Sequence, residues 1–491
     1  RHGATNERSY QYINFADKHG FDEVLIEGWA SGWQGLFPKD SVTVSFTKST
    51  EDFDLEKVQS YAKSKGVSLQ SYHETMASTK NYLSQIDSAF SLLNKLGIKN
   101  VKIGQVGKKL DRNQFHYGQY GVEYYRTVLS KALEYKIGVN FHEPIKDTGE
   151  RRTFPNMLTR EGARGMEYNA WIGGNPPDHT TILPFTRLLN APMDYTPGIF
   201  DLLFDNIDSD KAVEYPVEFF VIDSGNGYDE LMFKSSESIW REIPMTKKDT
   251  IYYNADRPVY IWELKQNFKV GEWEWGVTAN HNGLGEYDIW LPQLLKSSEN
   301  RKLKMSDEGE IDGVTKIIIP WQSLEANDKT SQKKEKPLKK LPRVSTTIAK
   351  QLALYVVIHS PLQMAADFIE NYEKISAFQF IKDVPVDWDT TVVINGEIGE
   401  YVTIARKDRN SEDWYLGSIT NGFERSMEVS LSFLEEGDYE AIIYADHEDS
   451  DWRTNPYSYT ISNIKIVKDD KLLIKMAKGG GQAVRIRYLD Q

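Results

Sequence analysis

The sequence predicts an α/β protein built on a (β/α)8 TIM barrel, with an inserted β-rich module and a C-terminal all-β sandwich. Three observations support this prediction. Up to about residue 200, segments with helical spacing of apolar residues alternate with short β-prone segments, as they do in parallel βα units. The alternation is interrupted between residues 207 and 342, and after Asp383 the pattern is β-like to the end.

The expected barrel elements follow one another as helix and strand. Helices are expected at Glu7–His19, Asp54–Lys65, Tyr82–Leu96, Tyr120–Tyr135 and Ser345–Val357. Strands are expected at Asp22–Trp29, Gly66–Glu74, Asn100–Val106, Ile137–Glu143, Met166–Trp171, Met193–Phe200 and Ser360–Asp367. An eight-stranded barrel needs one strand more, and we expect that first strand to precede Arg1.

These patterns divide the chain into three domains. Residues 1–206 and 343–383 are assigned to the barrel, residues 207–342 to the inserted module, and residues 384–491 to the sandwich. The module is expected to end in a basic tether at residues 331–343. Its aromatic residues either form a sugar-stacking platform or fill the core of a small sandwich, and the W-E-W alternation favours the core. The residues concerned are Trp262, Trp273, Trp275, Tyr287 and Trp290.

Composition excludes several classes of function. The net charge of −13 argues against a nucleic-acid partner, because neutralising phosphates requires a basic surface. The sequence contains no run of 18 apolar residues that would span a membrane. It contains no cysteine, which excludes disulfides, thiolate metal sites and a cysteine nucleophile.

Acidic residues lie at the ends of the expected strands. They are Glu27, Glu74, Glu143, Glu167, Asp194 and Asp367. In a barrel the carboxyl ends of the strands share one face, so these side chains are expected to converge there. The negative charges of such a cluster repel one another, so protons, a cation or a bound substrate must offset the repulsion. Glycoside hydrolysis, which uses two carboxyl groups, and calcium binding both fit.

Two histidines precede glutamates of this cluster, His73 before Glu74 and His142 before Glu143. A binuclear metal-dependent hydrolase typically carries an H-x-H pair on a strand, and the sequence has none. We therefore expect these histidines to orient carboxylates or to bond sugar hydroxyls rather than to bind zinc.

Long motifs of the chain resemble glycoside hydrolase family 97, closest to its starch-utilisation α-glucosidase branch. They include VLIEGW, YHET, HYGQYGVEYY, VNFHEP, EGARGMEYNAW, GNPPDHTTILPFTR, PMDYTPGIFD and SPLQMAAD. The likeness covers residues 1–205 and 343–491. It implies a barrel between an N-terminal and a C-terminal β-sandwich, with the N-terminal sandwich and first barrel strand outside this chain. It also implies a periplasmic or extracellular location.

The resemblance assigns roles to individual residues. Glu167 matches the family's general acid, and Glu143 together with Glu74 matches its general base. Glu161 matches a calcium ligand, and Glu143 is implied to contact the same ion. Residues implied or expected to contact the substrate are Lys102, His142 and Glu27.

The resemblance also suggests the stereochemistry. Retaining α-galactosidases of the family carry an aspartate nucleophile where this chain has Gly104. Without a carboxylate there, water must attack directly, which implies inversion and an acid and base standing about 6.5–9.5 Å apart. The acid Glu167 must then stay protonated near neutral pH, which apolar or like-charged neighbours would achieve.

The sequence thus leads to an inverting, calcium-dependent α-glucosidase acting on malto- or related oligosaccharides. Two alternatives stay open: a retaining α-galactosidase of the same family, and a glycan-binding protein without catalysis. Linkage and chain-length preference and oligomeric state do not follow from the sequence.

Overall fold

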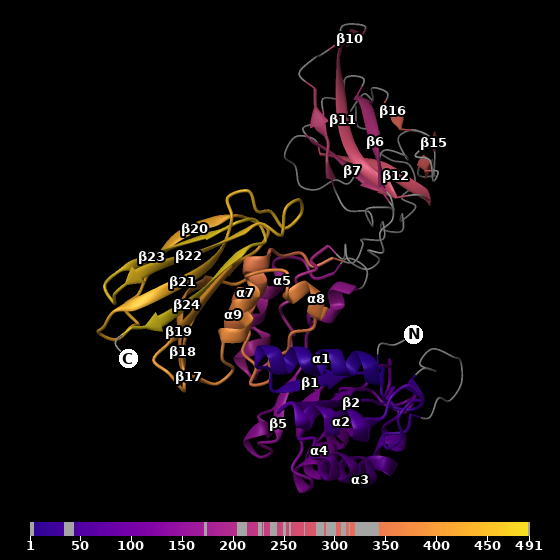
Figure 1. Ribbon diagram of the computed structural model, residues 1–491, viewed down its shortest axis with the longest axis vertical. Helices are drawn as coiled ribbons and strands as arrows, with labels where there is room; N and C mark the ends of the chain where they lie inside the picture. The colour runs from indigo at the N-terminus through magenta and orange to yellow at the C-terminus, as the bar shows by residue number, and fades with distance from the viewer. Residues whose placement is uncertain are drawn as a thin grey trace.

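The computed structural model describes residues 4–33, 44–170, 174–203, 214–223, 228, 230–235, 243–248, 252–254, 257–269, 271–280, 289–290, 301–305, 311–313, 315–319 and 343–489. Figure 1 shows three parts. An α/β part contains the N-terminal elements, a β-rich part stands apart from the rest of the ribbon, and a β-sandwich ends the chain. The α/β class, the β-rich insertion and the C-terminal sandwich are as the sequence predicts.

A five-stranded parallel sheet organises the α/β part. Its order follows the chain: β1 (Glu23–Ile26), β2 (Ser68–Glu74), β3 (Asn100–Gly104), β4 (Gly138–Phe141) and β5 (Met157–Arg160). The register pairs Glu74 of β2 with Gly104 of β3. Because all strands are parallel, the residues that follow them gather at one edge of the sheet.

Four helices connect and cover these strands. They are α1 (Asn6–His19), α2 (Leu55–Ser64), α3 (Thr79–Leu96) and α4 (Gln119–Glu134). Side chains of Thr5 and Asp54 cap α1 and α2 by accepting backbone N–H bonds, and Gly20 and Gly97 end α1 and α3 in the left-handed conformation. All four helices lie where the sequence predicts them.

The expected strand at Met166–Trp171 is wrong. Met157–Arg160 forms the fifth strand instead, and Glu167 lies in the 3-10 helix η3 (Met166–Ala170). Gly162, at φ 67°, turns the chain out of the sheet just after β5. The Asn169 side chain then bonds the carbonyl of Met166, which holds a turn in place of an extended strand.

The two last expected strands are also wrong. Met193–Phe200 makes one parallel bridge, between Arg160 and Met193, and no regular strand. Thr196 has a φ of 58° and is followed by proline, so the segment turns instead of running on. Ser360–Asp367, which starts Ser-Pro, is likewise irregular. Four of the seven expected strands therefore form among the described residues, and β5 is a fifth strand that the sequence did not predict.

Short helices complete the α/β part. They are η2 (Glu150–Arg152), α5 (His179–Ile182), η4 (Leu183–Phe185), η5 (Arg187–Leu189), α7 (Ile348–Val357), α8 (Ile369–Tyr372) and α9 (Phe378–Asp383). Every residue of α7 is buried, because this helix packs against β19 and β24 of the sandwich. It joins the α/β part to the C-terminal part (Figure 1).

The inserted module contains two mainly antiparallel sheets. The strand order of the first sheet is β10 (Tyr252–Asn254), β11 (Arg257–Lys269), β6 (Glu214–Asp223) and β16 (Lys316–Ile319), and β9 (Thr246–Lys247) also pairs with β11. The second has β15 (Ile311–Gly313), β14 (Arg301–Met305), β12 (Gly271–Asn280), β7 (Glu230–Ser235) and β8 (Ile243–Pro244), with β13 (Ile289–Trp290) on β12.

Aromatic side chains fill the core of this module. Trp262 and Trp275 are 3% and 0% exposed, and Trp275 packs edge-on against Phe219 with ring centroids 4.8 Å apart. A sugar-stacking platform that includes these two residues is therefore wrong. The side chains of Trp273, Tyr287 and Trp290, and residues 331–342 of the expected tether, lie outside the described residues.

The C-terminal part is an antiparallel sandwich. Its larger sheet runs β17 (Trp388–Glu397), β18 (Tyr401–Asp408), β19 (Trp414–Thr420), β24 (Gly481–Tyr488), β21 (Tyr439–Asp446) and β22 (Tyr459–Ile466). The smaller pairs β20 (Arg425–Ser430) with β23 (Lys471–Met476). One face of the larger sheet packs on the smaller sheet, and the other face packs on α7.

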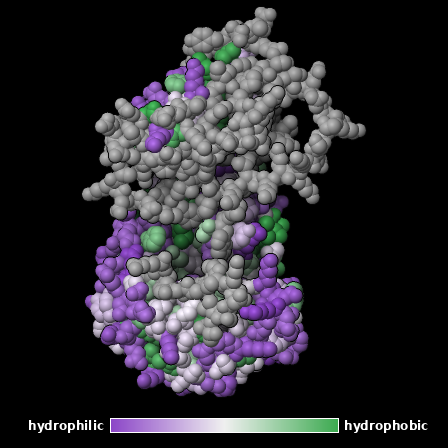
Figure 2. Space-filling view, turned by 90° about the vertical axis from the view of Figure 1, so that its right-hand side faces the viewer, coloured by the Kyte–Doolittle hydropathy of each residue, from purple (hydrophilic) through white to green (hydrophobic). Residues whose placement is uncertain are grey.

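The described surface of the α/β part is largely hydrophilic on the face shown in Figure 2, where hydrophobic residues occur in small separate patches. Among the described residues, no helix has the length and apolar character that crossing a membrane requires.

Candidate active site

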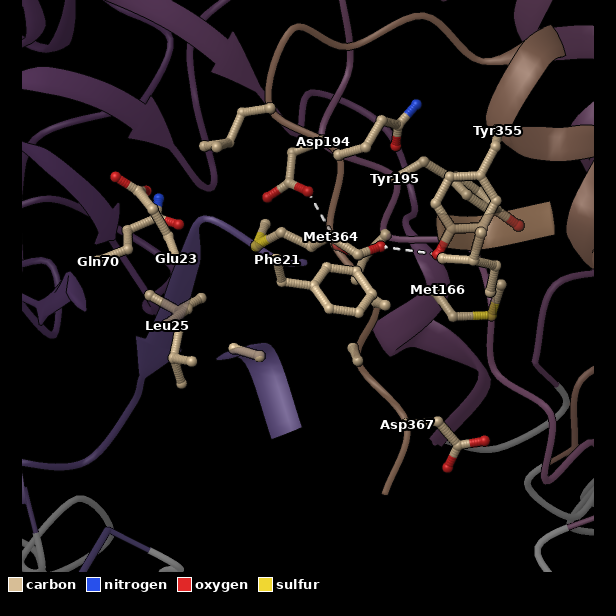
Figure 3. Close-up of a pocket in the computed structure, with 18 of the residues that line it drawn as sticks. Phe21, Glu23, Leu25, Gln70, Met166, Asp194, Tyr195, Tyr355, Met364 and Asp367 are labelled. Atoms are coloured by element: carbon tan, nitrogen blue, oxygen red, sulfur yellow. Dashed lines mark hydrogen bonds between the residues drawn. The ribbon is translucent and has the colours of Figure 1, made fainter. Parts of the chain in front are cut away.

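A cavity of about 990 Å³ opens between β1 and the segment that follows α7. Figure 3 shows Glu23, Leu25 and Gln70 on one side and Tyr355 and Asp367 on the other. The cavity also brings together charged side chains from the strand ends. They are Glu27, Lys102, His142, Glu161, Glu167 and Asp194.

Two further glutamates, Glu74 and Glu143, form what we call the carboxylate pair. The Glu74 carboxylate accepts bonds from the Val106 amide (3.1 Å) and the Tyr72 hydroxyl (2.9 Å). The Glu143 carboxylate accepts one from the Gln105 amide (2.7 Å). Consecutive amides at the end of β3 therefore hold both carboxylates.

Glu74 is 2% exposed. Burial, and then the charge of Glu143, raise the pKa of Glu74 to about 7. This carboxyl group can therefore gain or lose a proton near neutral pH.

The backbone of Glu143 is in the left-handed region, with φ 45°. Its carbonyl accepts a bond from the hydroxyl of Tyr125 on α4 (2.7 Å). A non-glycine residue in this region stores strain, which persists only where surrounding contacts fix it. Here the bonds from Tyr125 and Gln105 fix both ends of the residue.

Gly104 faces the carboxylate pair. A Cβ added at Gly104 would lie 2.0 Å from Oε2 of Glu74 and 2.6 Å from the Tyr72 hydroxyl. Both distances are far inside van der Waals contact. Any side chain at position 104 would therefore collide with Glu74 where it now lies.

Glu167 lies on a segment, residues 161–170, that we call the acid loop. Its carbonyls are held mainly by side chains: Asn175 bonds Gly165 (2.9 Å) and His179 bonds Arg164 (2.8 Å). The Glu167 side chain itself is exposed. The like-charged neighbours that the sequence suggested are present, because the charges of Glu167 and Glu161 interact.

His142 links the acid loop to a buried aspartate. Its Nε2 lies 2.6 Å from Oδ2 of Asp194, and its Nδ1 lies 3.7 Å from Oε2 of Glu161. Asp194 also accepts a bond from Asn140 (2.6 Å). Burial alone would raise the pKa of Asp194, but the bonds from His142 and Asn140 and the charge of Lys102 outweigh it and hold that pKa below its ordinary value.

Glu27 and Lys102 line the same cavity as the acid loop. Withdrawal from bulk water raises the pKa of Glu27, the charge of Lys102 opposes the rise, and the charge of Glu167 adds to it. Glu27 is nevertheless exposed, because its surface faces the cavity. Lys102 is 9% exposed, and its Nζ lies 5.7 Å from the ring centroid of Tyr72.

Comparison with protein families gives two matches. The model of "Glycoside hydrolase 97" matches residues 1–163, and that of "Glycosyl-hydrolase 97 C-terminal, oligomerisation" matches residues 387–487. A glycoside hydrolase family 97 enzyme from Pseudoalteromonas sp. strain K8, solved in complex with acarbose, is 34% identical with a TM-score of 0.69. The chain belongs to glycoside hydrolase family 97.

Two curated relatives are named as α-galactosidases. A "retaining alpha-galactosidase" of Bacteroides thetaiotaomicron is 23% identical over 99% of this chain and 51% of its own length. A "probable retaining alpha-galactosidase" of Streptomyces bingchenggensis is 28% identical over 38% of this chain and 27% of its own. The Pseudoalteromonas match covers 100% of this chain and 57% of that one. The chain thus spans a little over half the length of the Bacteroides and Pseudoalteromonas relatives.

The donor set of this family 97 site suits a hard cation. His142, Glu161 and Glu167 can place one ligand atom each within 4.8 Å of one another. The charges of Glu143 and Glu167 both act on Glu161. Three converging carboxylates fit calcium, which takes oxygen ligands. His142 suits it less, since nitrogen is a softer donor and its Nε2 is engaged by Asp194.

His73 does not line the cavity, and Asp367 lines it with a carboxylate that is already hydrogen-bonded. His73 is 0% exposed among aromatic rings and bonds the Tyr82 hydroxyl (3.0 Å), and burial lowers its pKa to about 3. The Asp367 carboxylate accepts bonds from the amides of Phe200 and Asp201. The expectation that His73 orients a catalytic carboxylate is wrong. Asp367 does line the same cavity as Glu27 and Glu167, as expected, but backbone amides engage its carboxylate.

Sequence reasoning missed the partners that position the site. Tyr72 and Tyr125 bond the carboxylate pair, and Asn175 and His179 bond the acid loop. The sequence predicts that His142 orients a carboxylate, and its bond to Asp194 agrees with this, but the sequence does not identify Asp194 as the partner. The motif GNPPDHTT, which supplies Asn175 and His179, was the available signal.

Proposed function

We propose that this chain carries the catalytic site of a calcium-dependent, inverting hydrolase that cleaves terminal α-glucosidic bonds of malto- or related oligosaccharides. The observation that carries the proposal is the steric relation between Gly104 and Glu74. With Glu74 in place, an aspartate nucleophile at position 104 has no room. Direct attack by water, and hence inversion, is the consistent alternative.

The general acid and the general base act on opposite faces of the sugar. Glu167 donates a proton to the glycosidic oxygen as the bond to the anomeric carbon breaks. Glu143, supported by Glu74, accepts a proton from the water that attacks the opposite face of the sugar. The pKa of Glu74, raised to about 7 by burial and by Glu143, gives the pair a proton acceptor near neutral pH.

Calcium, when bound, would supply positive charge that offsets the converging carboxylates and polarises the site. Glu161 and Glu143 are the ligands we propose. Lys102, His142 and Glu27 are proposed to bond substrate hydroxyls, since all three line or border the cavity with Glu167.

The glucoside specificity is supported by the solved relatives. Family 97 structures from Pseudoalteromonas that are 34% identical contain acarbose and panose, and panose is a trisaccharide of α-linked glucose. We further propose a periplasmic or extracellular location, as the family resemblance implies.

A second candidate is a retaining α-galactosidase, which is how the two curated relatives are named. It requires a nucleophile at a position other than 104. Comparing aryl α-glucoside with aryl α-galactoside as substrates of the full-length protein separates the two. A higher kcat/KM for the galactoside would favour the second candidate.

The acid assignment is tested by Glu167→Gln in the full-length protein. For a glucoside with a poor leaving group we expect kcat to fall by about 10²–10⁴-fold, and for one with a good leaving group by much less, because a good leaving group needs little protonation. Unchanged turnover of both substrates would exclude Glu167 as the acid. Binding of maltooligosaccharide without turnover in the parent protein would instead support a glycan-binding protein.

A further inference from the structure

Lys350, on helix α7, is a buried amine that joins two distant parts of the chain. Its side chain is 0% exposed, and its Nζ donates hydrogen bonds to the carbonyls of Pro177 and Thr420, both 2.7 Å away. Burial lowers the pKa of Lys350 to about 7, although the charges of Asp446 and Asp178 oppose the change. A neutral amine keeps two N–H groups, so either protonation state of Lys350 can hold both carbonyls.

The first acceptor, Pro177, lies in residues 175–179, which we call the support segment. Asn175 and His179, at its two ends, donate bonds to carbonyls of the acid loop, at 2.9 Å and 2.8 Å. The acid loop carries the proposed general acid and contributes residues to the wall of the cavity. Lys350 therefore bonds the middle of the segment whose two ends hold the acid loop.

The second acceptor, Thr420, belongs to the C-terminal sandwich. It is the last residue of β19, and its amide donates to the carbonyl of Gly480 (3.1 Å). Helices α5 and α7 both contact β19 and lie beside the sandwich in Figure 1. The amide of Gly399, between β17 and β18, also bonds the carbonyl of Thr181 on α5 (3.3 Å). The support segment is thus tied to the sandwich through Lys350 and, just beyond its end, through Thr181.

Glycines at the start of β24 make room for Lys350. A Cβ added at Gly481 would lie 2.7 Å from Cα of Lys350, and one added at Gly480 would overlap Oδ2 of Asp446. That oxygen accepts bonds from the amides of Ala477 and Gly481, both at 2.9 Å. Because these positions carry no side chain, the sandwich approaches α7 closely and holds Lys350 in a fixed place.

We propose that Lys350 is a positioning residue for the general acid. By holding the Pro177 carbonyl it fixes the support segment, and the support segment fixes the acid loop that carries Glu167. The sandwich takes part without touching the substrate, because it supplies the second anchor of Lys350. Proton transfer requires hydrogen-bond reach and orientation, so displacing the acid loop should lower kcat most where the leaving group needs protonation. This inference rests on the proposed role of Glu167 as the acid.

The test is Lys350→Met in the full-length protein. The substrates are two aryl α-glycosides of the sugar that the parent cleaves, one with a poor and one with a good leaving group. Methionine is nearly as long as lysine but donates no hydrogen bond. We expect kcat for the poor leaving group to fall about tenfold, and KM and the kcat for the good leaving group to stay within about twofold. An equal loss of kcat for both substrates would overturn the proposal.

Arg406→Met is the matched control. Arg406 is another buried cation between the sandwich and α7: it is 8% exposed, and its Nε donates to the carbonyl of Val356 on α7 (2.7 Å). Its other bond goes to Thr391 rather than to the support segment. Both variants should lower the melting temperature, but Arg406→Met should leave the ratio of the two kcat values unchanged. The same change of ratio in both variants would mean general loosening of α7 and would overturn the proposal.

Hydrogen exchange measured by mass spectrometry gives a readout that does not depend on turnover. Peptides from the acid loop and the support segment should exchange at least about fivefold faster in Lys350→Met but not in Arg406→Met. Unchanged exchange of the acid loop in Lys350→Met would contradict the proposal. If that variant does not fold, Lys350→Gln takes its place with the same expected outcomes, because glutamine is polar but one bond too short to bridge both carbonyls.

Failure of this inference and failure of the proposed function are distinguishable, because Glu167→Gln tests the acid itself. If Glu167→Gln shows the leaving-group effect and Lys350→Met does not, only the positioning role is wrong. If the parent cleaves no α-glycoside, or if Glu167→Gln lowers kcat equally for both leaving groups, the proposed function is wrong and the positioning role with it.

Discussion

The carboxylate pair and the acid loop are held in different ways. Glu74 and Glu143 accept bonds from successive backbone amides at the end of β3, whereas Glu167 is exposed on a short 3-10 helix. The carbonyls beside Glu167 are held by the side chains of Asn175 and His179. The proposed base is thus held at the end of a strand, and the segment that carries the proposed acid is held by side-chain hydrogen bonds.

This difference suits the two tasks. A base must fix one small water molecule against one face of the sugar, which a rigid strand end does well. An acid must reach the oxygen of leaving groups that differ in size, which an exposed residue on a loop can do. Changes at the carboxylate pair should therefore be severe and independent of the substrate, while changes at the acid loop should depend on the leaving group.

The largest effect is expected for Gly104→Ala. The added Cβ would lie 2.0 Å from the Glu74 carboxylate, so Glu74 must move from its amide partners. We expect kcat to fall by about 10²-fold or more for every substrate, measured by steady-state kinetics. At Gly422 an added Cβ meets nothing within 4 Å, and Gly422→Ala is the control. Full activity of Gly104→Ala would mean that the position of Glu74 is not required.

A second prediction concerns the dependence of stability on pH. The pKa of Glu74 is raised from 4.5 to about 7, so its neutral form stabilises the fold below about pH 4.5, and this contribution is lost as pH rises through 7. The glutamine of Glu74→Gln does not ionise, so the variant does not lose this contribution. The unfolding free energy of the variant minus that of the parent should therefore increase by up to roughly 3 kcal/mol between pH 5 and pH 8.

Thermal or denaturant unfolding at several pH values measures this shift. Glu134→Gln, on the exposed surface of α4, should show a constant difference from the parent across the same range. If Glu74→Gln also showed a constant difference, the Glu74 carboxyl would be charged in the folded protein at pH 5.

A third prediction concerns calcium. Glu161→Gln should weaken calcium binding by at least about tenfold, because it removes one of few converging carboxylates. Isothermal titration of the full-length protein with calcium chloride measures the affinity directly. Glu23→Gln is the control, because Glu23 lines the same cavity but bonds Asn100. Equal affinities in the two variants would exclude Glu161 as a ligand.

The smallest effect is expected for Asn175→Ala, next to the acid loop. Asn175→Ala removes the bond to the Gly165 carbonyl but leaves the bond from His179 to Arg164. We expect kcat to fall about tenfold for a poor leaving group and to change little for a good one. An equal loss for both leaving groups would indicate damage to the fold rather than displacement of Glu167.

The sequence predicts the two sides of the site unequally. Glu74 and Glu143 each follow an apolar, β-prone segment, and the parallel sheet places them together as expected. The segment around Glu167 is equally β-prone, but the predicted strand does not form. The Asn169 side chain bonds the Met166 carbonyl, and Asn175 bonds that of Gly165. These bonds outweigh local β propensity.

Long-range contacts explain what the sequence could not predict. The need for glycine at position 104 arises from Glu74, thirty residues earlier on the neighbouring strand. Asp194 reaches His142 across 52 residues of sequence. Neither relation leaves a local pattern of spacing or hydropathy, so only the folded chain reveals it.

The central claim is direct attack by water at a site without a nucleophile at position 104. Proton NMR of α-glucoside hydrolysis by the full-length protein with calcium identifies the anomer that is released first. The account predicts that β-glucose appears first and then mutarotates. If α-glucose appeared first, the reaction would proceed with retention, and the roles given to Glu74, Glu143 and Gly104 would be wrong.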